Sequence, residues 1–128
     1  MKDPAAPPSR NATIVRSDMI ETTEFEWGRI AFFANATVGL ATEQSLGRCE
    51  INPGAALPKH YHPNCSEVVY VVQGVITHTI EDDRVETLRA GDTIIVPRNF
   101  AHQAINIGEE VAVLMISFSA PNREFVVV

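Results

Sequence analysis

Histidine and glutamate side chains in one stretch of this sequence are spaced as metal ligands. His60 and His62 are separated by one residue, so in an extended strand both imidazoles point to the same face. Glu67 follows at the head of the apolar run 68–72. A carboxylate at such a place must reach water or gain a partner that offsets its desolvation. Because two imidazoles lie nearby, a divalent metal ion is the simplest partner.

A second stretch, residues 91–106, supplies a third histidine. His102 follows the strand-like run 93–96 and a turn that contains Pro97. The two stretches together hold three of the chain's four histidines. Three imidazoles and one carboxylate form a mixed nitrogen and oxygen donor set for a first-row divalent ion. The ligands that we expect are His60, His62, Glu67 and His102.

The two stretches resemble the paired motifs of the cupin superfamily. The first motif is glycine, five residues, His-x-His, three or four residues, glutamate, six residues and glycine. The sequence fits it at every position, with the four-residue spacer, through Gly54, His60, His62, Glu67 and Gly74.

The second motif is glycine, five residues, Pro-x-Gly, two residues, histidine, three residues and asparagine. Its matching residues are Gly91, Pro97, His102 and Asn106, and Asn99 stands where the family has glycine. That position requires a left-handed backbone, which asparagine tolerates better than other residues with a side chain. The local wording His-Tyr-His-Pro-Asn-Cys-Ser-Glu is also similar to germins and oxalate decarboxylases.

The resemblance implies an all-β fold, a single cupin β-barrel of the jelly-roll or double-stranded β-helix type. Turn signals recur along the whole chain and no segment has a long helical period, which is typical of a sandwich or barrel. We assign residues 17–128 to this domain and expect the proline-rich segment 1–16 to be flexible. Strands are expected at 27–34, 38–44, 46–51, 68–72, 75–80, 85–88, 93–96, 111–119 and 124–128.

The resemblance also implies the metal, because the corresponding residues of the family bind iron, manganese, nickel, zinc or copper. Four protein ligands fill a tetrahedral zinc ion, which would make the site structural. The same ligands on an octahedral ion leave two positions for substrate, water or dioxygen. We expect one divalent ion per chain, with Fe²⁺ or Mn²⁺ favoured and Ni²⁺, Zn²⁺ or Cu²⁺ as alternatives.

Glu67 is also the candidate catalytic residue, because a carboxylate that leaves the metal can act as a base. Arg48 could hold a carboxylate substrate by bidentate hydrogen bonds if its strand face lines the pocket. An exposed ion pair with Glu50 is the alternative for this arginine.

The fourth histidine, His78, shares a strand face with two isoleucines. A packed strand histidine is therefore the alternative to a role beside the metal ligands. The remaining candidates for the pocket wall are Tyr70, Phe100 and Met115, each of which could instead belong to the core.

The composition limits the classes of binding partner and the cellular location that we expect. The chain has 128 residues and a net charge of −6, which argues against nucleic acid as a partner. No apolar run approaches the length of a membrane span, and residues 1–9 contain no signal-peptide h-region. We therefore expect a cytoplasmic protein in which Cys49 and Cys65 are reduced thiols.

A homodimer is expected from the end of the chain. The run 125–128 is apolar and β-prone, and natural proteins usually cover such an edge. The aromatic stretch around residues 27–33 offers a surface for the second copy.

The function that we expect is a metal-dependent reaction on a small organic molecule, most simply an oxidoreductase of the dioxygenase type. A non-redox lyase, decarboxylase or isomerase of sugars or keto acids would use the same ligands. A cupin that binds a small ligand without turnover is the alternative from another class.

Overall fold

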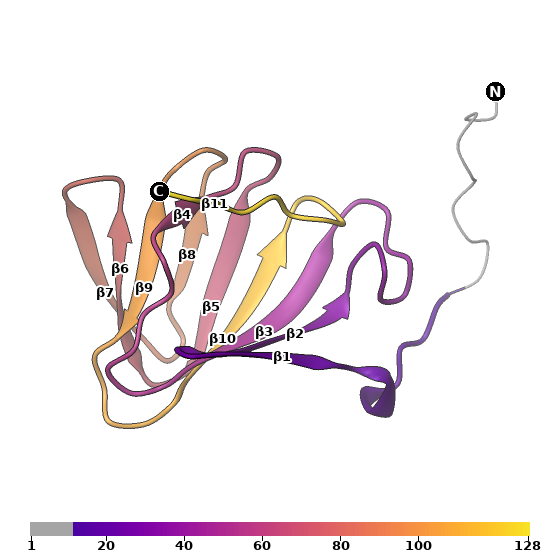
Figure 1. Ribbon diagram of the computed structural model, residues 1–128, viewed down its shortest axis with the longest axis horizontal. Coiled ribbons are helices and arrows are strands. Elements are labelled where there is room, and N and C mark those ends of the chain that lie inside the picture. The colour runs from indigo at the N-terminus through magenta and orange to yellow at the C-terminus, as the bar shows by residue number, and fades with distance from the viewer. Residues whose placement is uncertain (1–11) are drawn as a thin grey trace.

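The computed structural model describes residues 12–128 as two facing antiparallel sheets (Figure 1). One sheet has the strand order β1-β2-β3-β10-β5-β8 and the other has the order β11-β4-β9-β6-β7. A short 3₁₀ helix, η1 (Ser17–Met19), precedes the first strand. The strands are β1 (Thr22–Phe25), β2 (Gly28–Ala34), β3 (Ser45–Ile51), β4 (His60–Tyr61), β5 (Glu67–Gln73), β6 (Val75–Ile80), β7 (Arg84–Arg89), β8 (Thr93–Val96), β9 (His102–Asn106), β10 (Ala112–Phe118) and β11 (Val126–Val127).

The core lies between the two sheets. Most strands alternate buried and exposed side chains, and the buried ones point toward the opposite sheet. On β5, Glu67, Val69 and Val71 are buried while the residues between them are exposed. On β6 the buried positions include Ile76 and His78. The expected all-β jelly roll is confirmed.

Most expected strands are present with small shifts at their ends, but the strand expected at 38–44 is wrong. That segment forms turns, since the side-chain oxygen of Asn35 accepts hydrogen bonds from the backbone N–H groups of Thr37 and Val38. Gly39 and Leu40 then adopt a left-handed backbone, with φ of 74° and 55°. The mixed apolar and polar residues there favour a strand, but the hydrogen bonds of the Asn35 side chain stabilise a turn instead.

The turns of the two motifs contain left-handed residues, and the left-handed backbone predicted for Asn99 is confirmed. Gly54, Gly74 and Gly91 have positive φ, and Asn99 has φ of 71°. Asparagine therefore takes the place of glycine without changing the turn before β9. At Gly74 a Cβ atom would lie 3.1 Å from the Cα of Ala112, so both conformation and space favour glycine.

The segment that follows β10, residues 121–128, is the C-terminal strap. It runs across one end of the barrel and returns to the edge of the second sheet (Figure 1). There β11 pairs with β4, and the N–H of Val128 donates to the carbonyl of Lys59 at 3.0 Å. The Asn64 side chain donates to the Asn122 carbonyl and accepts from the Glu124 N–H. The strap is thus fixed beside the first motif.

The expected boundary at residue 16 stays a prediction. Residues 1–11 of the segment lie outside the described residues, and residues 12–16 form neither helix nor strand. Within residues 12–128, no helix has the length and hydrophobicity needed to cross a bilayer.

Candidate metal centre

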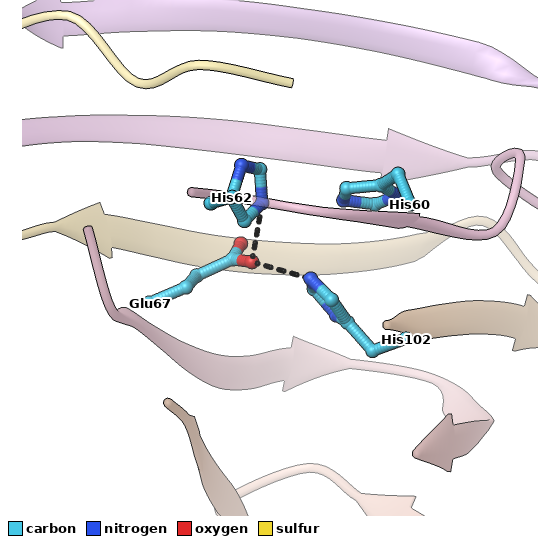
Figure 2. Close-up of side chains that lie close together, drawn as sticks. All are labelled: His60, His62, Glu67 and His102. Atoms are coloured by element: carbon cyan, nitrogen blue, oxygen red, sulfur yellow. Dashed lines mark ion pairs between the residues drawn. The ribbon is translucent and has the colours of Figure 1, made fainter. Parts of the chain in front are cut away.

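Four buried side chains, three from strands and one from the loop after β4, converge between the two sheets (Figure 2). One ligand atom from each of His60, His62, Glu67 and His102 lies within 4.8 Å of the others. The Oε1 atom of Glu67 lies 3.3 Å from Nε2 of His62 and 3.4 Å from Nε2 of His102. The structure therefore brings together the four residues that the sequence predicts.

Strand pairing explains this convergence. His60 on β4 and His102 on β9 are register partners, and their ring centroids lie 4.4 Å apart. His62 follows two residues after His60 and faces the same way, with a centroid distance of 4.8 Å. Glu67 opens β5 in the opposite sheet with its side chain buried, so it completes the group from across the barrel.

The proton positions of two histidines follow from their hydrogen bonds. Nδ1 of His60 lies 2.7 Å from the Pro58 carbonyl, and Nδ1 of His62 lies 2.7 Å from the Glu124 carbonyl. A carbonyl oxygen only accepts, so each Nδ1 carries the proton and the neutral ring keeps a lone pair at Nε2. Both lone pairs are then available to the site.

Those lone pairs and the carboxylate form a donor set that fits a cation. Nε2 of His62, Oε1 of Glu67 and Nε2 of His102 are buried and have no hydrogen-bond partner among the described residues. Buried polar atoms without partners are costly in a folded protein. A divalent ion between them would satisfy all three at once, as mixed imidazole and carboxylate ligands do for first-row metals.

Burial also keeps the imidazoles in the form that binds metal. Desolvation lowers the pKa of His60 to about 4 and that of His102 to about 2, with further lowering by neighbouring histidines. Both rings are therefore neutral at neutral pH. Metal ligation requires a neutral imidazole.

His78 lies directly behind one ligand. Its Nε2 atom is 2.9 Å from Nδ1 of His102, and the two rings are nearly parallel, at 4°. Desolvation lowers the pKa of His78 to about 4. The structure places His78 in the pocket wall, where its side chain is buried on β6.

A cavity of about 30 Å³ adjoins the four side chains. Most of its wall is apolar and comes from β5, β10 and the strap, including Val69, Leu114, Ile116, Phe118 and Phe125. Cys49 also lines it, and burial raises the pKa of this thiol to about 12. The thiol is therefore uncharged beside the site.

The Cupin domain family matches residues 47–118 of the chain, which include all four converging residues. The protein belongs to the cupin superfamily.

Curated relatives of this cupin include plant proteins. The auxin-binding protein ABP19b of Prunus persica is 39% identical over 82 residues, which are 61% of this chain and 39% of the relative. Germin-like protein 3-5 of Oryza sativa subsp. japonica is 30% identical over 125 residues, 92% of this chain and 51% of the relative. The cupin thus spans between about two fifths and one half of the length of these relatives.

Solved structures with the same fold include oxalate decarboxylases. The formate complex of the Lactobacillus farciminis enzyme has a TM-score of 0.80 and 27% identity, over 87% of this chain and 34% of that chain. A Bacillus subtilis oxalate decarboxylase studied for its Mn(II) centres has a TM-score of 0.78 and 27% identity, over 84% and 30%. The resemblance to germins and oxalate decarboxylases is confirmed.

Four residues proposed for the pocket lie elsewhere in this cupin, which corrects the prediction. Arg48, Met115 and Tyr70 are register partners on β3, β10 and β5. They lie on the outer face, where Arg48 pairs with Glu50 at 2.7 Å and Tyr70 is 45% exposed. Because side chains alternate along a strand, their sequence neighbours Cys49, Leu114 and Val69 point to the inner face and line the cavity.

Phe100 is the fourth correction. It lies in the turn between β8 and β9, is 40% exposed and does not line the cavity. The turn keeps its backbone near Pro97, through a hydrogen bond from the Phe100 N–H to the Pro97 carbonyl. Its ring is therefore partly exposed and forms no part of the cavity wall.

Arg123 is the main residue of the site that the sequence analysis missed. It comes from the strap and lines the cavity with the metal ligands. Its guanidinium carbon lies 5.1–5.5 Å from the ring centroids of Phe32, Phe118 and Phe125, and no carboxylate within residues 12–128 forms an ion pair with it. No spacing rule links an arginine after the last long strand to the ligands of the two motifs.

Proposed function

We propose that this cupin is a metal-dependent enzyme that acts on a small organic acid. The observation that carries the proposal is a cavity that combines the ligand set with one arginine, Arg123, which forms no ion pair with a carboxylate of residues 12–128. The ligands fit a divalent cation, and the guanidinium fits a carboxylate by bidentate hydrogen bonds. An apolar wall excludes water and strengthens both interactions.

Each residue has a distinct role in this proposal. His60, His62, His102 and Glu67 hold the ion, whose chemistry would be the polarisation of a bound carboxylate. Arg123 orients the acid from the strap. Glu67 is the one carboxylate among the cavity residues, so it is also the available base.

The solved structures favour Mn²⁺ and a decarboxylation or oxidation of the acid. Oxalate decarboxylases and an oxalate oxidase have the same fold at 26–27% identity, and one decarboxylase is described with Mn(II) centres. Octahedral coordination by four protein ligands leaves two positions for such a substrate. The dioxygenase reading of the sequence stays a prediction, as does the cytoplasmic location.

The test begins with metal. Protein expressed without added metal is analysed by mass spectrometry, then reloaded with Mn²⁺, Fe²⁺, Ni²⁺ or Zn²⁺ and supplied with short mono- and dicarboxylic acids, oxalate included. Release of CO₂ under strict anaerobiosis would establish a decarboxylase. Oxygen consumption matched to product would establish an oxidase or a dioxygenase. A protein that binds metal but turns over no acid with any of the four ions would support the non-catalytic alternative.

A pair of variants tests the role of the arginine. Arg123→Met should raise KM for the acid by at least about tenfold, because it removes a charged partner of the carboxylate. Arg48→Met is the matched control, since Arg48 lies exposed on the outer face. Equal effects of the two substitutions would contradict the assignment of Arg123.

A further inference from the structure

The three histidines of the site are not held alike. His60 and His62 each have Nδ1 on a backbone carbonyl, at 2.7 Å. His102 instead has Nδ1 on a side chain, the Nε2 atom of His78, at 2.9 Å. A carbonyl fixes the tautomer of its partner, whereas an imidazole nitrogen can donate or accept. The proton position of His102 therefore depends on His78.

Only one arrangement of this pair frees His102 for a metal ion. Its Nε2 atom faces Glu67 and the site, so this atom must carry the lone pair. The proton of His102 then lies on Nδ1 and is donated to Nε2 of His78. That nitrogen must be unprotonated, and the proton of the neutral His78 ring consequently lies on its own Nδ1.

The surroundings of His78 show that this arrangement has a cost. The side chain is 2% exposed, and its Nδ1 atom has no hydrogen-bond partner among the described residues. An unpaired buried polar atom lowers stability. Its neighbours on the same face of β6 are isoleucines, Ile76 and Ile80, both buried. Packing alone would be served equally well by a third aliphatic side chain.

We propose that His78 is the positioning residue of His102: it accepts the Nδ1–H of His102 and thereby leaves Nε2 of His102 free for the metal ion. The inference rests on the proposed metal-dependent function. It goes further because it gives the fourth histidine, which lies outside both motifs, a role in orienting a metal ligand. Residues that orient a metal-ligating histidine commonly change metal affinity when they are replaced.

The first test is metal affinity, measured with Zn²⁺ and Mn²⁺ in competition with a chromophoric chelator. His78→Leu fills the space without an acceptor and should weaken binding by about ten- to a hundredfold. His78→Gln places an acceptor oxygen near the position of Nε2 and should recover most of the affinity. Ile76→Ala is the control, because it loosens the same buried face of β6 without touching a ligand.

Two outcomes of this test would overturn the proposal. If His78→Leu and Ile76→Ala weaken metal binding equally, the role of His78 is packing. If His78→Gln binds metal as poorly as His78→Leu, an acceptor at this position has no part in the site.

The second test needs no metal and separates this inference from the proposed function. Nitrogen-15 NMR of the metal-free protein reports which ring nitrogen of His102 carries the proton. His78→Leu should move that proton from Nδ1 toward Nε2, where Glu67 is the acceptor that remains, 3.4 Å away. An unchanged protonation pattern would overturn the role of His78. Failure of the wild type to bind any metal would instead refute the proposed function, whatever the NMR shows.

Discussion

At the scale of single residues, the site is defined by atoms that all accept hydrogen bonds. The carbonyls of Pro58 and Glu124 hold the Nδ1–H groups of His60 and His62, so each Nε2 carries a lone pair, and that of His62 lies 3.3 Å from Oε1 of Glu67. Buried acceptors that face one another repel unless a cation lies between them. This is the physical reason for expecting metal.

Replacement of Glu67 by glutamine tests the carboxylate. The substitution keeps the size and one oxygen donor but removes the charge and the basicity. We expect turnover of the acid to fall by at least about a hundredfold, within the usual effect of losing an acid–base group, while metal is partly retained. Steady-state kinetics and metal analysis on the same sample check both points. Turnover within a few-fold of the wild type would show that Glu67 is not the base.

The Asn106 side chain stabilises the fold around the site by hydrogen bonds to backbone groups. Its side-chain amide donates to the carbonyls of Ile51 and Glu110, and its oxygen accepts from the Gly108 N–H, all at 2.8–2.9 Å. Asn106→Ala should cost about 2–4 kcal/mol of unfolding free energy, because it leaves buried backbone groups unpaired. Urea unfolding measures this loss, with exposed Asn122→Ala as the control. A loss below about 1 kcal/mol would contradict the structural role.

The ligands were predictable from sequence because strand alternation fixes which side chains share a face. The same rule could have excluded Tyr70, since it lies three residues after buried Glu67 and so on the opposite face of β5. Excluding Arg48 and Met115 requires the register between β3 and β10, which no local pattern supplies. Arg123 requires the path of the strap, and that path depends on contacts far apart in sequence.

At the scale of elements, the strap contacts two of the expected metal ligands. Its Glu124 carbonyl holds His62, and the ring of Phe125 stacks on His60 with centroids 4.0 Å apart. The sequence predicts a short terminal strand, and β11 confirms it. What the sequence did not indicate is that the residues just before β11 contact two metal ligands.

Shortening the chain tests the strap. A chain that ends at Asn122 loses Arg123, Glu124 and Phe125, and its metal affinity should fall by about tenfold or more because His62 loses its carbonyl partner. A chain that ends at Phe125 is the matched control, since it lacks only residues 126–128, which comprise β11 and Val128. Chelator competition compares the two. Equal affinities would show that the contacts of the strap with the histidines do not matter for binding.

At the scale of the whole molecule, acid should destabilise the metal-free protein. The folded-state pKa values of His60, His78 and His102 are lowered to about 4, 4 and 2, from an ordinary value of 6.5. As pH falls below 6.5 the unfolded chain therefore binds protons before the folded chain does, and stability is lost. Between pH 6.5 and 5 the loss should be on the order of 4 kcal/mol for three such groups.

Urea unfolding at several pH values measures this loss. At pH 8 and above the contribution of these histidines is almost fully present, so stability should be nearly flat there. His78→Leu should reduce the slope below pH 6.5, because one of the titrating groups is gone. A stability that does not change between pH 6.5 and 5 would mean that the histidines are protonated in the folded state.

The homodimer expected from the sequence stays a prediction at this scale. Phe125, Val126 and Val127 are 37–58% exposed at the edge of the second sheet, and apolar edges are commonly covered. Sedimentation at micromolar concentration should show a dimer. A monomer throughout that range would refute it.

The strap also decides how this protein could be engineered. A designer who enlarges the cavity by deleting the strap also removes the Glu124 carbonyl that orients His62 and the Phe125 ring that stacks on His60. A change in the strap that makes more room for substrate would therefore also weaken the binding of metal. The wall formed by Leu114, Ile116 and Phe118 on β10 touches the same cavity but belongs to another element. Smaller side chains there would admit bulkier acids while the ligand supports stay in place, so a redesign of substrate range should begin on β10.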